Sequence, residues 1–184
     1  TGFSNNKLIA GFLPYKDAYF HYLAGREIIS GNLIPTFNLA SSWRPLYAGF
    51  LSILLLLSGI NLQASLAIIT AMTAIACYLA SRQVFKTFGT WPAAIFITLL
   101  YLYAHKVIGE SGTEQVGLLF GCLGFYLLWQ AAIQKNLATL LLGTVTLTTA
   151  LSIRAGAFFI LPMLILWAGW IFRKGKRFSV GIAS

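Results

Sequence analysis

The chain has 184 residues, of which 58% are hydrophobic and only 9% are charged, against roughly 25% charged residues in an ordinary soluble domain. This composition excludes a soluble globular protein and predicts an all-α polytopic membrane protein, because the uncharged runs approach the ~20 apolar residues that a membrane-crossing helix needs. The net charge of +9 does not indicate nucleic acid as a partner, because the Lys and Arg residues are scattered through the predicted loops.

The first predicted element is an amphipathic helix in residues 14–31, "PYKDAYFHYLAGREIISG", which ends at Gly31. Only four acidic residues occur in the chain, and Asp17 and Glu27 both lie here. Three tyrosines accompany them, and tyrosine suits a membrane surface because it has one apolar and one polar end. We therefore expect a helix that rests on the bilayer.

The next apolar run, residues 45–60, is shorter than a membrane span. It is either a short span or a helix that lies in the interface. Counting loop charges favours a span, because the Lys and Arg residues of the first 44 positions would then join the more basic, cytoplasmic side.

Five further apolar runs each have about the length of one crossing. They predict spans near residues 62–81, 88–105, 115–134, 136–153 and 155–172. The domain organisation expected is an external segment with juxtamembrane helices in residues 1–61 and a transmembrane bundle in residues 62–184. Because the chain lacks an initiator Met and a signal-peptide pattern, we expect it to be a piece of a longer protein.

Charged residues at the ends of these runs are the candidate functional groups. The acids are Glu110 and Glu114, which are either site residues or solvated loop carboxylates. The cations are Arg44, Lys106 and Arg154, for which snorkelling to the interface is the alternative. Arg154 stands between two apolar runs, which predicts a tight turn with one buried charge, and a guanidinium is well shaped to bind a phosphate.

The two histidines are candidate metal ligands. His21 and His105 could bind a divalent metal ion together with Asp17 and Glu114, but the chain has no HExxH, CxxC or similar spacing. Cys77 and Cys122 fall inside apolar runs, where a small buried side chain is the default interpretation.

The order of these segments resembles the N-terminal module of polyprenyl-phosphate-dependent, GT-C type glycosyltransferases, the superfamily of protein O-mannosyltransferases and lipid A aminoarabinose transferases. The segments that carry the resemblance are "KDAYFHYLAGREIISGNLIP", "SWRPLYAGFLSILLLLSGI", "SGTEQVGLLFGCLGFYLLW" and "LSIRAGAFFILPMLILWAGW". It extends over nearly the whole chain and implies that residues 45–60 lie at the interface.

The resemblance also implies roles for individual residues. Asp17, followed by the aromatic Tyr19, would be the catalytic base, with Glu114, Glu110 and His21 in support of the acceptor or a metal. Arg44, Lys106 and Arg154 would bind the donor phosphate. The chain departs from the family pattern at Leu46, where a second proline is common, at Ile153, which is inserted before Arg154, and beside Asp17, where a second acid is absent.

The function implied is transfer of a sugar from a polyprenyl-phosphate sugar to an acceptor lipid, glycan or protein, with inversion at the anomeric carbon. The enzyme would be integral to a membrane, the bacterial inner or plasma membrane, with its active face on the extracytoplasmic side. The alternative is a non-enzymatic membrane protein, either a transporter or an assembly subunit, whose polar residues line a path or fix helix packing.

Overall fold

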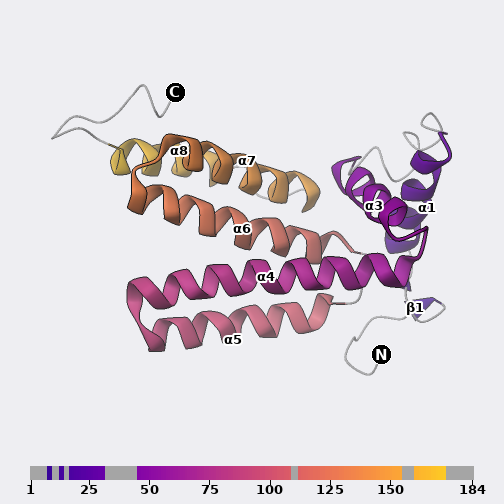
Figure 1. The fold of residues 1–184 in the computed structure, drawn as a ribbon, viewed down its shortest axis with the longest axis horizontal. Coiled ribbons are helices and arrows are strands. Elements are labelled where there is room, and N and C mark those ends of the chain that lie inside the picture. Colours follow the sequence, from indigo (N-terminus) through magenta and orange to yellow (C-terminus); the bar gives the residue numbers. More distant parts are fainter. Residues whose placement is uncertain are drawn as a thin grey trace.

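The computed structural model describes residues 8–9, 13–14, 17–31, 45–108, 112–154 and 160–172. Within these ranges the protein is helical apart from one antiparallel pair of two-residue strands, β1 (Leu8–Ile9) and β2 (Leu13–Pro14). The helices are α1 (Asp17–Ile29), α3 (Pro45–Leu57), α4 (Leu62–Phe88), α5 (Thr90–Val107), α6 (Thr113–Gln134), α7 (Leu137–Arg154) and α8 (Ile160–Ile171), as Figure 1 shows.

Three of the described helices are long and apolar enough to cross a membrane, namely α4 with 27 residues, α6 with 22 and α7 with 18. Large apolar side chains on their outer faces, such as Ile75 and Val145, are exposed at 60% and 62%. Exposed apolar surface of this extent is typical of a lipid-facing protein. The predicted all-helical membrane class therefore agrees with the structure.

The prediction of five spans is not confirmed. The run predicted at 88–105 corresponds to the helix α5 (Thr90–Val107), and it is not among the three candidates. Trp91 and Pro92 at its start and His105 and Lys106 at its end lower its mean hydropathy. Residues 155–159 of the last predicted span lie outside the described residues, and the 12-residue α8 is too short by itself.

A capping side chain and a glycine, rather than charged residues, set the ends of α4. Asn61 caps the start of α4, where its side-chain oxygen accepts a 3.1 Å hydrogen bond from the backbone N–H of Ala64. Gly89 ends α4 with φ +88°, a conformation open to glycine, and α5 begins at the next residue. The chain therefore reverses direction within a single residue, and α5 returns along α4.

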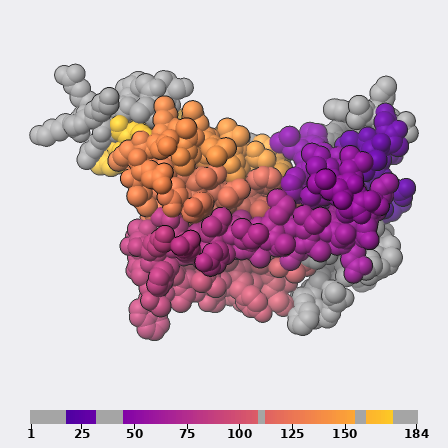
Figure 2. Space-filling model, in the orientation of Figure 1, coloured from indigo at the N-terminus to yellow at the C-terminus, as the bar shows by residue number. Residues whose placement is uncertain are grey.

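Helices α4 to α7 lie lengthwise beside one another in alternating directions (Figure 1). We name the "α3 end" of this bundle the end that holds the first turns of α4 and α6 and the last turns of α5 and α7. Figure 2 shows α1 and α3, in indigo and purple, gathered at this end of the molecule.

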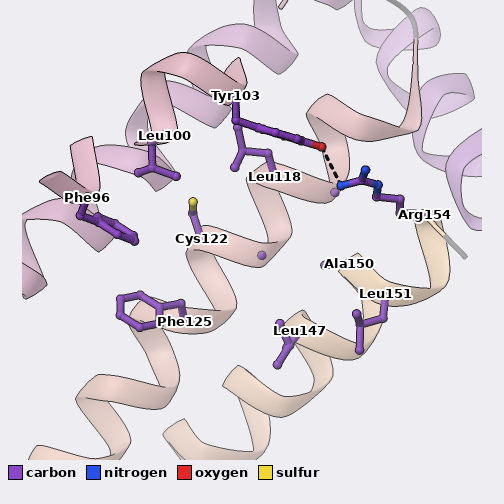
Figure 3. Close-up of a pocket in the computed structure, with 12 residues that line it drawn as sticks. Phe96, Leu100, Tyr103, Leu118, Cys122, Phe125, Leu147, Ala150, Leu151 and Arg154 are labelled. Carbon is purple, nitrogen blue, oxygen red and sulfur yellow. Dashed lines mark hydrogen bonds between the residues drawn. The ribbon is translucent and has the colours of Figure 1, made fainter. Parts of the chain in front are cut away.

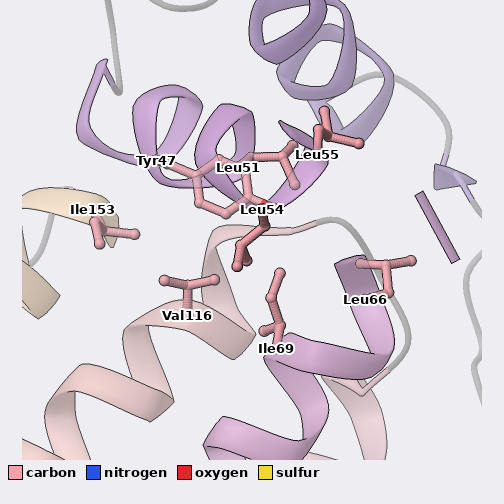
Figure 4. Packing of buried hydrophobic residues seen from close by; sticks show 8 residues of the cluster. All are labelled: Tyr47, Leu51, Leu54, Leu55, Leu66, Ile69, Val116 and Ile153. Carbon is pink, nitrogen blue, oxygen red and sulfur yellow. The ribbon is translucent and has the colours of Figure 1, made fainter. Parts of the chain in front are cut away.

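The short helix α3 packs across the α3 end. Its 13 residues span about 20 Å. The cluster that it forms with the bundle, drawn in Figure 4, consists of Tyr47, Leu51, Leu54 and Leu55 from α3, Leu66 and Ile69 from α4, Val116 from α6 and Ile153 from α7. Since the partners come from the terminal turns of three helices, α3 closes the bundle at this end.

Helix α1 packs on α3 in turn, and its buried face includes Ala18, His21 and Ala24. A Cβ at Gly25 would lie 3.3 Å from Leu55 Cδ1, so the two helices approach closely there. Gly31 has φ +82° just after the helix, as the predicted stop at this glycine requires.

Helices α4 and α6 are parallel neighbours joined by polar pairs. Gln115 Nε2 donates to Thr70 Oγ1 at 2.9 Å, Cys77 Sγ and Cys122 Sγ are 3.8 Å apart, and Gln130 Nε2 donates to Gln83 Oε1 at 2.8 Å. The partners are separated by 45, 45 and 47 residues, a nearly constant offset that only a parallel pair produces. Interhelical side-chain hydrogen bonds of this kind add to packing in membranes.

The backbones of α6 and α7 approach closely at two glycines. A Cβ at Gly143 would lie 2.9 Å from the backbone nitrogen of Leu128, and one at Gly124 would lie 3.0 Å from that of Leu147. Because helices in a membrane associate largely through van der Waals packing, such glycines bring the helices into close contact.

Candidate functional site

An apolar groove of about 620 Å³ runs between α5, α6 and α7 (Figure 3). Its walls include Phe96 and Leu100 from α5, Leu118 and Phe125 from α6, and Leu147 and Leu151 from α7. On α6, Gly121 also faces the groove, and a Cβ there would meet nothing within 4 Å. The volume falls within the range of ligand pockets, and the lining suits a hydrocarbon chain.

Arg154 stands at the mouth of this groove, at the α3 end. Its Nη1 donates a 2.7 Å hydrogen bond to Tyr103 Oη across the groove, and its guanidinium carbon is 5.6 Å from the centroid of the Tyr103 ring. Gly117 on α6 leaves room for the stem of Arg154, whose Cβ and Cδ would both lie 3.6 Å from a Cβ at that glycine. A positioned guanidinium above apolar walls is suited to an oxyanion with a hydrocarbon tail.

The predicted environment of Arg154 was wrong in part. It is the last residue of α7 and is exposed rather than buried, and residues 155–159, where the predicted turn falls, lie outside the described residues. A cation at this position is favoured by the dipole of α7, whose negative end it occupies. An exposed guanidinium at the rim of the groove remains available to a ligand.

Aromatic rings lie at the other end of the groove, where Phe96 and Phe125 line it. The Phe96 and Phe125 rings have centroids 5.8 Å apart, and the Phe125 and Trp129 rings follow at 5.5 Å. The groove therefore has a cationic mouth and an aromatic floor.

The structure brings together three of the charged residues predicted for the site. Lys106 is in the last turn of α5, Glu114 is in the first turn of α6, and Arg154 ends α7, so all three lie at the α3 end. Arg44 and Glu110, predicted with them, lie outside the described residues.

The predicted site residues of α1 are placed at the same end, because α1 packs on α3. Asp17 is the first residue of the helix, and its side chain lies outside the described part of the structure. Tyr19 is 41% exposed, whereas His21 is 5% exposed and packs edge-on against the Tyr47 ring, with centroids 4.8 Å apart. Among the described residues, no three His, Cys, Asp or Glu side chains gather in a way that could hold a metal ion.

Tyr47 is a buried polar residue that was not predicted as part of the site. Its side chain is fully buried and its hydroxyl has no hydrogen-bond partner among the described residues. Burial, with a further contribution from the negative charge of Glu114, raises the pKa of Tyr47 above its ordinary value. The phenol is therefore held in its neutral form beside the predicted site.

Tyr103 and the groove were also missed. In the segment "YLYAHK" Tyr103 is one of two tyrosines that are two residues apart, and nothing local distinguishes it from Tyr101, which is 64% exposed. A signal existed on α6, where Gly117 and Gly121 form a GxxxG pattern. That pattern predicts a close helix contact, but in this structure the two glycines leave space for Arg154 and for the groove.

Comparisons of the chain with protein-family models, with characterised proteins and with solved structures give no match. The site geometry and the sequence pattern are therefore the basis for a functional proposal.

Proposed function

We propose that this chain is the donor-binding module of a membrane glycosyltransferase that uses a polyprenyl-phosphate sugar. The observation that carries the proposal is the apolar groove between α5, α6 and α7 with Arg154 at its mouth. Hydrocarbon of the donor would occupy the groove, and the guanidinium would bind the phosphate in two parallel hydrogen bonds. Lys106, at the same end, would add positive charge toward the phosphate.

The reaction is a displacement at the anomeric carbon. The acceptor oxygen or nitrogen attacks this carbon, the bond between carbon and phosphate oxygen breaks, and the polyprenyl phosphate leaves with inversion. Asp17 takes the proton from the acceptor as it attacks. Arg154 stabilises the negative charge that develops on the departing phosphate. The acceptor is a lipid, glycan or protein.

The resemblance to the glycosyltransferase superfamily supports an extracytoplasmic position for the α3 end. Loop charge does not decide the orientation, because the described cations are evenly divided between the two ends of the bundle. Those toward the α3 end are Arg26, Lys106 and Arg154, and those toward the opposite end are Arg82, Lys86 and Lys135. We therefore assign the opposite end to the cytoplasm on the resemblance.

Transfer from a radiolabelled polyprenyl-phosphate sugar to membrane acceptors, measured with the full-length protein, tests this proposal. We expect Asp17→Asn to lower turnover by about 10²- to 10⁴-fold, the usual contribution of a general base, and Arg154→Gln to weaken donor binding. Lys86→Gln, at the opposite end, is the matched charge-loss control and should transfer normally. Near-normal turnover of Asp17→Asn would reject Asp17 as the base.

Failure of the wild-type protein to transfer any sugar, with retained uptake or assembly function in cells, would favour the non-enzymatic alternative. A cysteine introduced at Ser4 and labelled from outside the cell checks the orientation separately. Labelling from the cytoplasmic side would overturn the assignment of the α3 end.

A further inference from the structure

The only two cysteines of the chain face each other across the α4–α6 contact. Cys77 Sγ and Cys122 Sγ are 3.8 Å apart, and both residues are free thiols. A disulfide bond has a length of about 2.05 Å. The two sulfur atoms therefore need to approach by less than about 2 Å to form one.

The surrounding contacts hold α4 and α6 in the register that the bond requires. The Thr70–Gln115 hydrogen bond lies on one side of the cysteine pair and the Gln83–Gln130 hydrogen bond lies on the other. Ala76 and Ala80 pack in the same cluster as Cys122, and their small side chains keep the two helices close.

Cavities flank the cysteine pair on both sides. Cys122 lines the 620 Å³ groove, and Cys77 lines a second cavity of about 340 Å³ between α4 and α5. Leu100 lines both cavities, so the pair stands close to the wall between them. This space allows the sulfur atoms to shift without compressing a filled core, and it gives an apolar reagent a route to Cys122.

We propose that Cys77 and Cys122 form a redox-modification site that is oxidised to a disulfide by organic hydroperoxides, such as oxidised lipids, which enter through the groove. The apolar walls of the groove favour an apolar reagent. The inference rests on the position of the thiols and the groove and does not depend on the proposed glycosyl transfer.

The reaction balances in two steps. Cys122 Sγ attacks the terminal oxygen of the hydroperoxide, the O–O bond breaks, and the alcohol leaves with the thiol proton, which gives a sulfenic acid. Cys77 Sγ then attacks the sulfenic sulfur, the S–O bond breaks, and water leaves. Two thiols and one hydroperoxide thus yield one disulfide, one alcohol and one water, and α4 becomes covalently tied to α6.

The test is exposure of the protein in lipid nanodiscs to cumene hydroperoxide, followed by alkylation of the remaining thiols and peptide mass spectrometry. We expect a Cys77–Cys122 cross-linked peptide, loss of two hydrogens from the intact mass, and recovery of both thiols on reduction. The Cys77→Ala variant should stop at a sulfenic acid on Cys122, which dimedone traps. Thiols that stay fully alkylatable while glutathione in the same sample is oxidised would overturn the proposal, as would dimers linked between two chains as the main product.

The route is tested by the series Gly121→Ala and Gly121→Leu, which fills the groove in two steps beside Cys122. Oxidation by cumene hydroperoxide should slow several-fold along the series. Gly49→Leu is the matched control, because a Cβ at Gly49 on α3 also meets nothing within 4 Å, yet this residue does not line the groove. Equal rates in the wild-type protein and in both Gly121 variants would reject entry through the groove.

Discussion

The guanidinium of Arg154 and the hydroxyl of Tyr103 are joined by a 2.7 Å hydrogen bond that connects the last turn of α7 to α5. The contact crosses the mouth of the groove and has two structural effects. It fixes the guanidinium above the apolar walls, and it joins α5 to a helix from which the groove otherwise separates it (Figure 3).

Removal of the Tyr103 hydroxyl should weaken binding of a lipid phosphate without abolishing it. In Tyr103→Phe the ring remains, but Arg154 loses the acceptor that positions it. We expect the Kd for dodecyl phosphate to rise about three- to tenfold, and by about ten- to a hundredfold in Arg154→Gln, since a hydrogen bond to a charged group is worth ~1.5–3 kcal/mol. Tyr101→Phe, on an exposed face of α5, is the control. If Tyr103→Phe bound dodecyl phosphate as tightly as the wild-type protein, Tyr103 would not position Arg154 for the ligand.

A side chain at Gly143 should destabilise the bundle. Alanine is favoured over glycine in a helix by about 1 kcal/mol, but its Cβ would lie 2.9 Å from the backbone of Leu128, so α6 and α7 must separate. We expect Gly143→Ala to lose about 1–3 kcal/mol of unfolding free energy. At Gly121, where the space is open, the same substitution should be neutral or stabilising. Reversible unfolding in mixed micelles measures both, and an equal response of the two variants would contradict the close contact.

Filling the groove at Gly121 should block hydrocarbon while leaving the fold intact. Leucine at this position would extend into the space between α5 and α7. We expect Gly121→Leu to lose most of its dodecyl phosphate binding while its affinity for free inorganic phosphate and its unfolding midpoint stay close to those of the wild-type protein. If the long-chain ligand bound equally well to both proteins, the hydrocarbon would lie elsewhere.

Tyr47 should make the protein sensitive to alkali. The pKa of Tyr47 in the folded state is raised above its ordinary value of 10.0 by burial first and by Glu114 second. Below pH 10 both folded and unfolded forms carry the neutral phenol; above it only the unfolded form ionises readily, so stability falls as pH rises.

Tyr47→Phe should lose less stability than the wild-type protein as the pH rises above 10. At neutral pH we expect the variant to be as stable as the wild type, or more stable by up to about 1 kcal/mol, because the hydroxyl lost has no partner among the described residues. Unfolding midpoints between pH 7 and about pH 11 give the comparison, with the exposed Tyr78→Phe as control. A large loss of stability at neutral pH would mean that the hydroxyl has a partner, such as a bound water.

Much of the helical arrangement could be predicted because the apolar runs are long and their ends are marked. The run predicted at 115–134 corresponds to α6, which extends from Thr113 to Gln134. The helix predicted at 62–81 was too short. The uncharged run stops before Arg82, whereas the helix α4 continues to Phe88. A charged side chain ends an apolar run but does not end a helix, and Gly89 does.

The candidate site was only partly predictable. Successive spans run in opposite directions, so the start of one span and the end of the next lie at the same end of the bundle. This places Glu114, in the first turn of α6, at the same end as Arg154, the last residue of α7. The groove depends on how far α5 stands from α6 and α7, which is a property of three packed helices and leaves no local pattern. Tyr103 is identified only by its partner on α7, 51 residues away.

The parallel course of α4 and α6 explains why a groove exists. Two neighbouring helices that run the same way cannot be joined by a short turn, so the helix between them must return beside the pair rather than within it. That helix is α5, and Ala93 is its one buried residue. The α4–α6 contact and the glycine contacts of α7 therefore maintain the fold largely without α5. Substitutions on the groove side of α5 that keep the contacts of Phe96 and Leu100 with the α4–α6 core can alter which hydrocarbon is accommodated with little change in stability.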